Sequence, residues 1–338
     1  MPHAIVVGAG GISGAWFPPL KAEGIDIAAV VDLNLDAARQ RIEQHELPDA
    51  RALDDLDKAL ADHDADFVVD LTVPAAHCEV TCKALEAGCH VIGEKPMAAS
   101  FDQARRMVEA SERTGRLYMV SQSRRWNPGV LEAANAVSHG LLGALTAIHC
   151  DFFLGAHFGG FRAAMDHVLL VDMAIHHFDL ARKLGRVDPL GVYCQQFNPV
   201  GSWYADGPAA NALFDMSDGV KFAYRGSWCD QGRKTSWDGD WRLQCVEGSI
   251  HYEQDQPAVA HRVVGDAFVR ESRPVDLTTD QPEVRGQRAA LREMLGYLAD
   301  GTMPQSECHD NIKSFAMVTA AIESARTSRR VDIEKMLA

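Results

Sequence analysis

The sequence predicts two different folds along one chain: a doubly wound α/β domain with a parallel sheet, then an α+β domain with a large, mostly antiparallel, open-faced sheet. The chain has 338 residues, more than one core usually holds. Up to about residue 121, short apolar runs alternate with amphipathic helical patterns, which is typical of βαβ units. After residue 122, period-two runs dominate. We therefore expect domains at 1–122 and 123–338, with the last helices packing near the junction.

The first domain is expected to begin with a strand and to keep alternating. Ser100 and Gln103 form a capping box, and Gly115 provides a C-terminal stop for the helix between them. The expected strands are 3–8, 25–32, 66–72, 89–94 and 116–122, and the expected helices run through Leu20 and over 35–45, 75–88 and 100–115.

The second domain should contain long strands at 144–154 and within 190–252, with Asp218-Gly219 as a hairpin turn. One helix near 168–184 interrupts them. Two more, near 285–300 and 310–327, close the chain.

Composition narrows the class of protein. The net charge of −14 argues against nucleic acid or an anionic membrane as the main partner. No apolar stretch approaches the roughly 20 residues of a membrane span, and the N-terminus does not resemble a signal peptide. The eight cysteines include no C-x-x-C pair, so we interpret them as buried thiols of a cytoplasmic protein.

A glycine-rich turn follows the first strand. Gly8 and Gly10 match the first two glycines of G-x-G-x-x-G, and Ser13 takes the third place, where a small residue is needed for close packing. Backbone N–H groups at a helix start would then bind a pyrophosphate. The turn predicts a Rossmann dinucleotide site.

Asp32 ends the second strand, about 20 residues after the turn, where a carboxylate binds the adenosine ribose. The alternative is a capping or turn residue. Leu33-Asn34 follows, without an Arg or Lys for a 2′-phosphate, so NAD is preferred over NADP as cofactor.

Three further motifs follow in order: D-L-T-V-P-A-A-H at 70–77, G-E-K-P-M-A at 93–98 and V-D-M-A-I-H-H-F-D-L-A at 171–181. With the glycine turn, this set resembles the Gfo/Idh/MocA family of NAD(P)-dependent oxidoreductases, which act on sugars, inositols and related polyols. The resemblance covers essentially the whole chain. It implies a dehydrogenase acting on CH–OH groups, and a homodimer or homotetramer assembled through the second-domain sheet.

The resemblance also implies the site residues. Lys95 would reach the substrate hydroxyl, Glu94 would lie against the cofactor, and Asp172 and His176 would complete the catalytic set. The implied cofactor-binding residues are Gly8, Gly10, Gly11, Ile12, Ser13, Asp32, Leu33, Thr72, Pro74, His77, Glu94, Lys95, Gln122, Arg125 and Trp126. The implied or candidate substrate-binding residues are Lys95, Arg125, His157, Arg162, Asp172 and His176.

Oxidation of a carbinol requires removal of the hydroxyl proton and stabilisation of the alkoxide. We assign His176 as proton acceptor, Asp172 as orienting or substrate-binding carboxylate and Lys95 as electrostatic anchor. The roles of Lys95 and His176 could be exchanged. His177 points about 100° away from His176 on a regular helix, so a packed or capping role is expected.

Three questions remain open from the sequence: metal binding, the location of four tryptophans, and the function. A metal is not expected, because adjacent histidines cannot face one ion from a regular helix, although His157 and His167 could supply missing ligands. These two histidines are otherwise expected to line the substrate cleft or to lie on the surface. Tryptophans 203, 228, 237 and 241 belong to a sugar platform, to the core or, as we favour for most, to a subunit interface. The function is a sugar or polyol dehydrogenase, an NAD-recycling glycoside-cleaving enzyme or a non-catalytic dinucleotide sensor.

Overall fold

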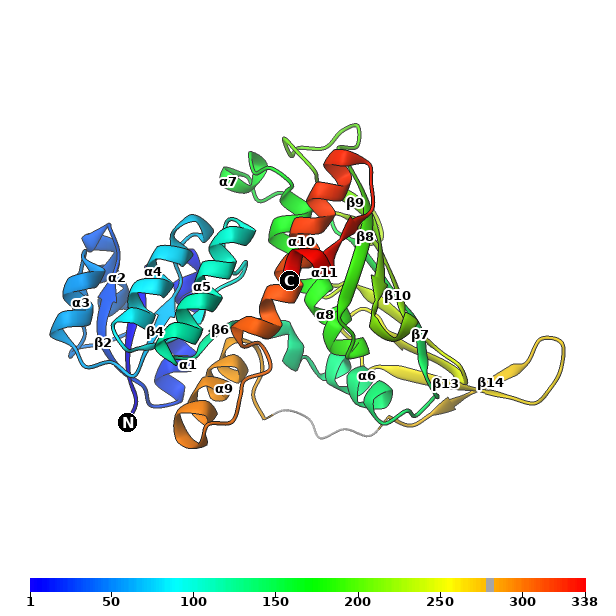
Figure 1. Ribbon diagram of the computed structural model, residues 1–338, viewed down its shortest axis with the longest axis horizontal. Helices are drawn as coiled ribbons and strands as arrows, with labels where there is room; N and C mark the ends of the chain where they lie inside the picture. The colour runs from blue at the N-terminus through cyan, green and yellow to red at the C-terminus, as the bar shows by residue number, and fades with distance from the viewer. Residues whose placement is uncertain (278–282) are drawn as a thin grey trace. The chain divides into compact units, whose positions relative to one another are not determined.

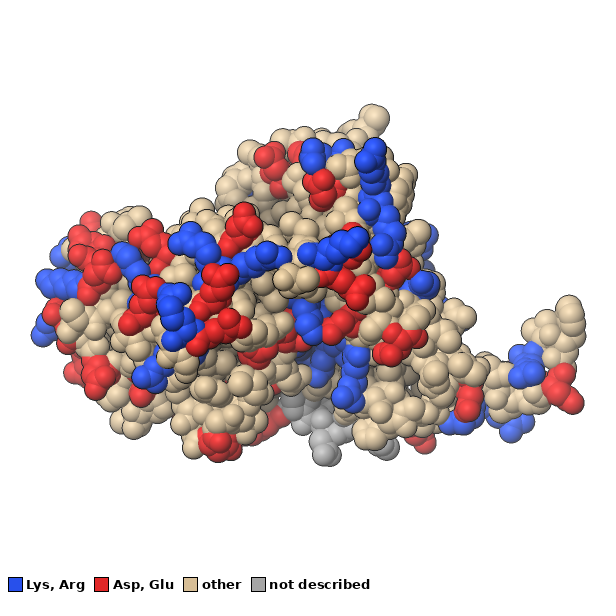
Figure 2. Space-filling model, viewed as in Figure 1, with Lys and Arg blue, Asp and Glu red and all other residues tan. Residues whose placement is uncertain are grey.

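The structure, a computed structural model, describes residues 1–277 and 283–338. The chain divides into two compact units: residues 1–123 with 284–312, and residues 124–283 with 313–338. Among the described residues, no helix is long and apolar enough to cross a membrane. Acidic and basic side chains are interspersed over the face shown in Figure 2.

The first unit contains a six-stranded parallel sheet in the order β3-β2-β1-β4-β5-β6. The strands are β1 (His3–Val7), β2 (Asp26–Val31), β3 (Arg51–Leu53), β4 (Phe67–Asp70), β5 (His90–Gly93) and β6 (Tyr118–Val120). The order reverses between β1 and β4. Ligands of doubly wound sheets bind at the carboxyl ends of the strands beside such a reversal.

Five helices connect successive strands of this sheet, so right-handed crossovers place them on both faces. They are α1 (Phe17–Ala22), α2 (Leu35–Gln44), α3 (Leu56–Asp62), α4 (Pro74–Glu86) and α5 (Phe101–Thr114), and the unit also contains α9 (Gly286–Asp300), which comes from later in the chain. Figure 1 shows α4 and α5 side by side, and they are packed against each other. The predicted cap of α5 is present: Ser100 accepts from the Gln103 N–H, and Gly115 ends the helix with a positive φ.

Two features of this unit were not predicted. The short edge strand β3 and helix α3 occupy residues for which no element was expected. The helix expected after the glycine turn is instead a 3-10 segment, η1 (Gly11–Ala15), followed by α1. Pro18 and Pro19 lie in the first turn of α1, where a missing N–H costs nothing, so the α-helix can begin only there.

The first unit also includes residues 284–312, which were expected in the second domain. The reason is visible in the contacts of α9, which packs on α1. Arg288 and Arg292 both donate to Glu23, just after α1, and Arg292 does so at 3.0 Å. Residue Glu307 also bridges to Met119 of β6.

The second unit contains a nine-stranded sheet in the order β14-β13-β12-β11-β7-β10-β9-β8-β15. Among the described strands of this second sheet, only β7 and β10 pair in parallel, which confirms the mostly antiparallel prediction. The strands are β7 (Leu145–Phe153), β8 (Pro189–Phe197), β9 (Ala209–Met216), β10 (Lys221–Ser227), β11 (Asp240–Cys245), β12 (Gly248–Tyr252), β13 (Val259–Val264), β14 (Glu271–Val275) and β15 (Val331–Asp332). Asp218 and Gly219 have positive φ and turn the chain between β9 and β10, as predicted.

One face of this sheet is covered by helices and the other is open. Along β7, Ile148, Cys150 and Phe152 are buried, whereas His149 lies on the opposite face and is exposed. Helices α6 and α8 pack together on the covered face, as Figure 1 shows. The helical segments are η2 (Ser123–Trp126), α6 (Pro128–Ser138), α7 (Gly160–Ala163), η3 (Leu169–Ala174), α8 (Ile175–Gly185), η4 (Ser217–Gly219), α10 (Cys308–Thr327) and α11 (Ile333–Leu337), the first five residues of α10 belonging to the first unit.

Two tryptophans do not fit the favoured interface interpretation. Trp228 and Trp241 are 2% and 1% exposed and belong to the core. Trp241 is one of the buried residues that alternate with more exposed ones along β11, and it stacks on Phe222 with ring centroids 6.1 Å apart. Trp237 is exposed, and Trp203 stacks on His157.

Candidate active site

The glycine turn lies at the reversal of strand order in the first sheet. Gly8 has φ +102°, and a Cβ there would lie 2.7 Å from the carbonyl carbon and oxygen of Leu71, which follows β4. A side chain is therefore excluded at Gly8 on two grounds. A Cβ at Gly10 or Gly11 would meet nothing within 4 Å. The backbone at these two positions is open to an approaching ligand.

Ser13 and Asp32 flank this turn. The Ser13 hydroxyl is buried and donates to the Gly10 carbonyl at 2.7 Å. Asp32 accepts from the Ala9 N–H at 2.7 Å and from the Asn34 N–H at 2.8 Å. These bonds place its carboxylate beside the turn, where the ribose interpretation requires it.

Arg41 of α2 was not identified from the sequence. Its guanidinium donates to the carbonyls of Ala9 and Gly10 at 3.1 and 2.9 Å. This contact joins residues 32 positions apart, so no local motif could reveal it. Arg41 therefore tethers the glycine turn.

Apolar side chains are exposed along the carboxyl edge of the sheet. Ile12, Leu33 and Val73 follow β1, β2 and β4 and are 41%, 95% and 66% exposed. Exposed apolar groups in one row are typical of a surface that a ligand covers. These three exposed apolar side chains and the open backbone of the glycine turn fit a dinucleotide cofactor. Val73 was missed, although it lies between the predicted residues Thr72 and Pro74.

His77 connects two loops at the same edge. Its Nε2 lies 2.9 Å from the Thr72 carbonyl oxygen, and its Nδ1 lies 3.0 Å from that of Pro96. The Thr72 hydroxyl donates to buried Asp70 at 2.6 Å. Pro74 begins α4, as its fixed φ favours. The Thr-x-Pro…His motif thus positions the loop after β4 against the Lys95-Pro96 segment.

Glu94 and Lys95 follow β5 directly. Glu94 is buried and accepts from Trp16 Nε1 at 2.9 Å and from the Lys95 N–H at 3.2 Å. Burial raises the pKa of the Glu94 carboxyl, and the Trp16 hydrogen bond opposes that rise. Lys95 is partly buried, at the strand edge predicted for it. Gln122 is buried just beyond β6.

Asp172 lies in an irregular helical segment of the second unit. Residues Leu169–Ala174 form a π-helical turn, η3, that continues into α8. Such turns occur frequently at functional sites. Arg162 donates from Nε to Asp172 Oδ2 at 2.5 Å, and its guanidinium lies over the rings of Phe158 and Phe161. No partner of Arg162 was expected from the sequence, and the structure pairs it with Asp172.

The two adjacent histidines have different surroundings. His176 is 8% exposed on the first turn of α8. His177 is fully buried, with its ring nitrogens 3.2 Å from the Tyr224 hydroxyl and from the Trp237 carbonyl. Burial, with a smaller effect from Arg124, lowers the pKa of His177 to about 3. His177 is a packed histidine, as its position on the helix predicted.

Other predicted site residues have partners within the second unit. His157 stacks on Trp203 with centroids 3.6 Å apart, and His167 Nδ1 lies 3.0 Å from Gln196 Oε1. Arg125 forms two hydrogen bonds with Asp179, at 2.7 and 2.6 Å, and both side chains are buried.

Trp126, next to Arg125, is 7% exposed. Because of its two hydrogen bonds with Asp179, two nitrogens of the Arg125 guanidinium bind that carboxylate and not a ligand. The sequence identified neither this pairing nor its consequence, because the partners are 54 residues apart.

Family models match both units. The model described as "Oxidoreductase family, NAD-binding Rossmann fold" matches residues 3–122. A second, "GFO/IDH/MocA C-terminal domain", matches residues 130–251.

Curated relatives match the chain at modest identity, two of them over most of its length. An uncharacterized protein of Sinorhizobium fredii is 25% identical over 98% of this chain and 95% of its own length. The D-apiose dehydrogenase of Paraburkholderia graminis is 27% identical over 93% of this chain and 84% of its own length. The inositol 2-dehydrogenase of Arthrobacter sp. is 29% identical over 52% of each chain.

Solved structures share the fold. An oxidoreductase from Agrobacterium radiobacter, in complex with NAD+, L-tartaric acid and magnesium, superposes with a TM-score of 0.87 at 22% identity, covering 99% of both chains. The aldose-aldose oxidoreductase of Caulobacter crescentus, complexed with glycerol, gives 0.81 at 20% identity, covering 98% of this chain and 99% of that one. With the two family models and the glycine turn, these matches establish that the chain belongs to the Gfo/Idh/MocA family of NAD-binding oxidoreductases.

Proposed function

We propose that this enzyme transfers a hydride between NAD and a carbinol or carbonyl carbon of a sugar, inositol or related polyol. The observation that carries the proposal is the position of Lys95, directly after β5, on the strand edge that also holds the glycine turn and Thr72. An ammonium group at that edge can hydrogen-bond an alcohol oxygen and stabilise the alkoxide. NAD, when bound, accepts or returns the hydride.

The second unit would supply the proton transfer and the substrate contacts. His176 is assigned as proton acceptor, since an imidazole titrates near neutral pH. Asp172, held by Arg162 at 2.5 Å, would orient the substrate or His176. Lys95 and His176 could exchange roles. Carboxylate, guanidinium and imidazole groups together offer both acceptors and donors, which suits a substrate with several hydroxyl groups.

The substrate class rests partly on named relatives. D-apiose and inositol, the compounds named for two relatives, both carry several hydroxyl groups. Arg162 would additionally suit a carboxylate, so sugar acids belong in the same test.

The decisive experiment is a substrate panel. The protein is mixed with NAD and with pentoses, hexoses, inositols and sugar acids, and the absorbance of the reduced nicotinamide is followed. Turnover of at least one polyol supports the proposal. Cleavage of a glycoside without net NADH would instead identify the cofactor-recycling alternative, and NAD binding without any turnover would identify a sensor.

A matched pair of lysine variants tests the role of Lys95. Lys95→Met should lower kcat by about 10²–10⁴-fold with little change in the Kd of NAD, because the ammonium acts on the reacting oxygen. Lys58→Met, at an exposed position on α3, should leave kcat unchanged. Full turnover by Lys95→Met would refute the assigned role.

The enzyme is further proposed to assemble as a homodimer or homotetramer through the open face of the second sheet. Tyr193 and Leu213 pair across β8 and β9 on that face and are 39% and 62% exposed. Beside them lies a polar recess of about 420 Å³, lined by His149, Asp151, Ala223, Arg225, Asp240, Trp241, Arg242, His251 and Glu253. Sedimentation of Leu213→Asp as a smaller species than the native protein would support this assembly; unchanged sedimentation would contradict it.

A cytoplasmic location is proposed from the cysteines. All eight are free in the structure, and six of them are buried. Free thiols in this number suit a reducing compartment.

A further inference from the structure

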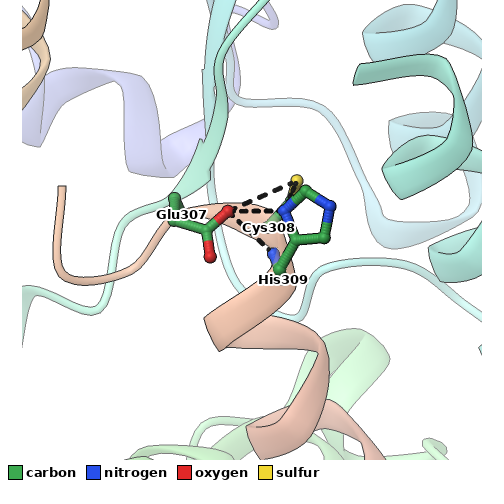
Figure 3. A group of neighbouring side chains, drawn as sticks. All are labelled: Glu307, Cys308 and His309. Carbon is green, nitrogen blue, oxygen red and sulfur yellow. Dashed lines mark hydrogen bonds and ion pairs between the residues drawn. The ribbon is translucent and has the colours of Figure 1, made fainter. Parts of the chain in front are cut away.

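Three consecutive side chains converge at the start of α10. His309 Nδ1 lies 2.8 Å from Glu307 Oε2. Cys308 Sγ lies 3.6 Å from His309 Nδ1 and 3.8 Å from Glu307 Oε2. Figure 3 shows the three side chains turned toward one another. We propose that Glu307, Cys308 and His309 bind a divalent transition-metal ion of the zinc class through one oxygen, one sulfur and one nitrogen.

The separations of the three donor atoms fit a tetrahedral ion. Zinc bonds of ~2.3 Å to sulfur and ~2.0–2.1 Å to nitrogen and oxygen require sulfur–nitrogen and sulfur–oxygen separations of about 3.5 Å, and a nitrogen–oxygen separation of about 3.3 Å. The two sulfur separations, 3.6 and 3.8 Å, agree with this requirement. The nitrogen–oxygen pair, at 2.8 Å, is a hydrogen bond that would lengthen by about half an ångström when an ion replaces the shared proton.

A carboxylate outside the group orients the histidine. His309 Nε2 lies 2.9 Å from Oε1 of Glu112, which comes from α5. Metal-bound histidines usually donate their second ring N–H to a carboxylate, which fixes the tautomer and the ring orientation. Glu112 would hold the proton on Nε2 and leave the lone pair of Nδ1 directed at Cys308 and Glu307.

Asn311 is a candidate for the fourth ligand. It follows Cys308 by three positions on α10, and helical side chains lean toward the N-terminus of the helix. Asn311 is 1% exposed, and neither its amide oxygen nor its amide nitrogen has a hydrogen-bond partner among the described residues. A buried amide without partners costs free energy, and ligation through its oxygen would remove part of that cost.

Helix capping alone does not account for the group. Glu307 accepts from the N–H groups of His309 and Asp310, at 3.0 and 2.8 Å, and so caps α10. A carboxylate offers about four lone-pair sites, so capping leaves capacity for an ion. Capping also explains neither the turn of the Cys308 thiol toward His309 nor the contact with Glu112.

The ion would have a structural role within the first unit. Glu307 bridges to Met119 of β6, and His309 reaches α5 through Glu112, so an ion would join the start of α10 to a strand and a helix. Binding releases to solvent both the thiol proton of Cys308 and the proton shared by His309 and Glu307, which the ion replaces, and nothing is oxidised or reduced.

The test is a cobalt titration of the full-length, chelator-treated protein. Co²⁺ bound by a thiolate gives a near-ultraviolet charge-transfer band, and a tetrahedral site gives strong visible bands. We expect both, saturating near one ion per chain and bleached by Zn²⁺. Cys308→Ser should abolish the charge-transfer band. Glu112→Gln should keep the band with an affinity about 10–100-fold lower.

A control variant separates this site from another pair of thiols. Cys78 and Cys82 lie four residues apart on α4. Cys82→Ser should therefore leave the cobalt spectrum unchanged. His309→Gln, at an exposed position that should not disturb folding, should weaken cobalt binding with an unchanged circular dichroism spectrum. The proposal is overturned if the native protein gives no thiolate band, if the band persists in Cys308→Ser, or if it disappears in Cys82→Ser.

Discussion

Trp16 donates a hydrogen bond of 2.9 Å from its indole Nε1 to Oε1 of Glu94, and both side chains are buried. The bond joins the segment after the glycine turn to the end of β5, 78 residues later. The Glu94 carboxyl group is therefore held inside the protein next to Lys95 in the chain. It accepts one hydrogen bond from the Trp16 indole and one from the Lys95 backbone N–H.

Glu94→Gln should stabilise the enzyme at neutral pH. Because burial raises the pKa of Glu94 in the folded state, the unfolded chain ionises first as the pH rises above 4.5, the ordinary value. The native protein then loses stability until the pH passes the raised pKa. Glutamine keeps an acceptor for Trp16 without that ionisation. Urea unfolding should show a gain for the variant at pH 7 and none at pH 4; an equal loss at both would contradict the prediction.

His177→Gln should reduce the acid sensitivity of the fold. The pKa of His177 is lowered to about 3 by burial, whereas the unfolded chain takes up a proton near the ordinary value of 6.5. The stability that the neutral His177 ring contributes to the folded state is therefore fully present above pH 6.5 and is lost as the pH falls from 6.5 to about 3. Melting temperatures of the variant should fall less over this window. His149→Gln, exposed on β7, should follow the native curve.

Arg125→Met should destabilise the second unit by about 3–5 kcal/mol, because it leaves the Asp179 carboxylate buried without its main partner. The double variant Arg125→Met/Asp179→Leu should recover most of that loss. Urea denaturation measures both. A role confined to ligand binding would predict a raised KM with unchanged stability, so an unchanged unfolding free energy would contradict the structural role.

Features that depend on local sequence were predictable. The glycine turn, the Ser100 cap and the turn at Asp218-Gly219 each depend on a few adjacent residues, and each is present. The π-helical turn around Asp172 was not predictable, because its apolar spacing also suits a regular helix.

Contacts between distant residues were missed for a different reason. Arg41 with Ala9, and Arg125 with Asp179, pair residues 32 and 54 positions apart. Arginine side chains are long and pair with any acceptor that the fold brings near them, so the sequence does not indicate the partner. For the same reason, residues 284–312 were expected in the second domain, whereas they belong to the first compact unit. The contact of α9 with Glu23 joins residues more than 260 positions apart, so the sequence does not indicate it.

Asp32→Ser should shift cofactor preference from NAD toward NADP. The carboxylate beside the glycine turn can accept from ribose hydroxyls, and it repels a 2′-phosphate. A hydrogen bond to a charged group contributes about 1.5–3 kcal/mol, so kcat/KM with NAD should fall by roughly 10–150-fold while that with NADP rises. Asp36→Ser, exposed in the first turn of α2, should change neither value.

Arg41 decides how large that shift becomes. Its guanidinium donates to the carbonyls of Ala9 and Gly10, and Asp32 accepts from the N–H of the same Ala9, so Arg41 is a cation available to a 2′-phosphate once Asp32 is replaced. The double variant Asp32→Ser/Arg41→Gln should therefore lose the gain with NADP that the single variant shows. Steady-state kinetics with both cofactors measures the outcome. If Asp32→Ser left the ratio of the two kcat/KM values unchanged, Asp32 would be a turn residue and not a ribose ligand.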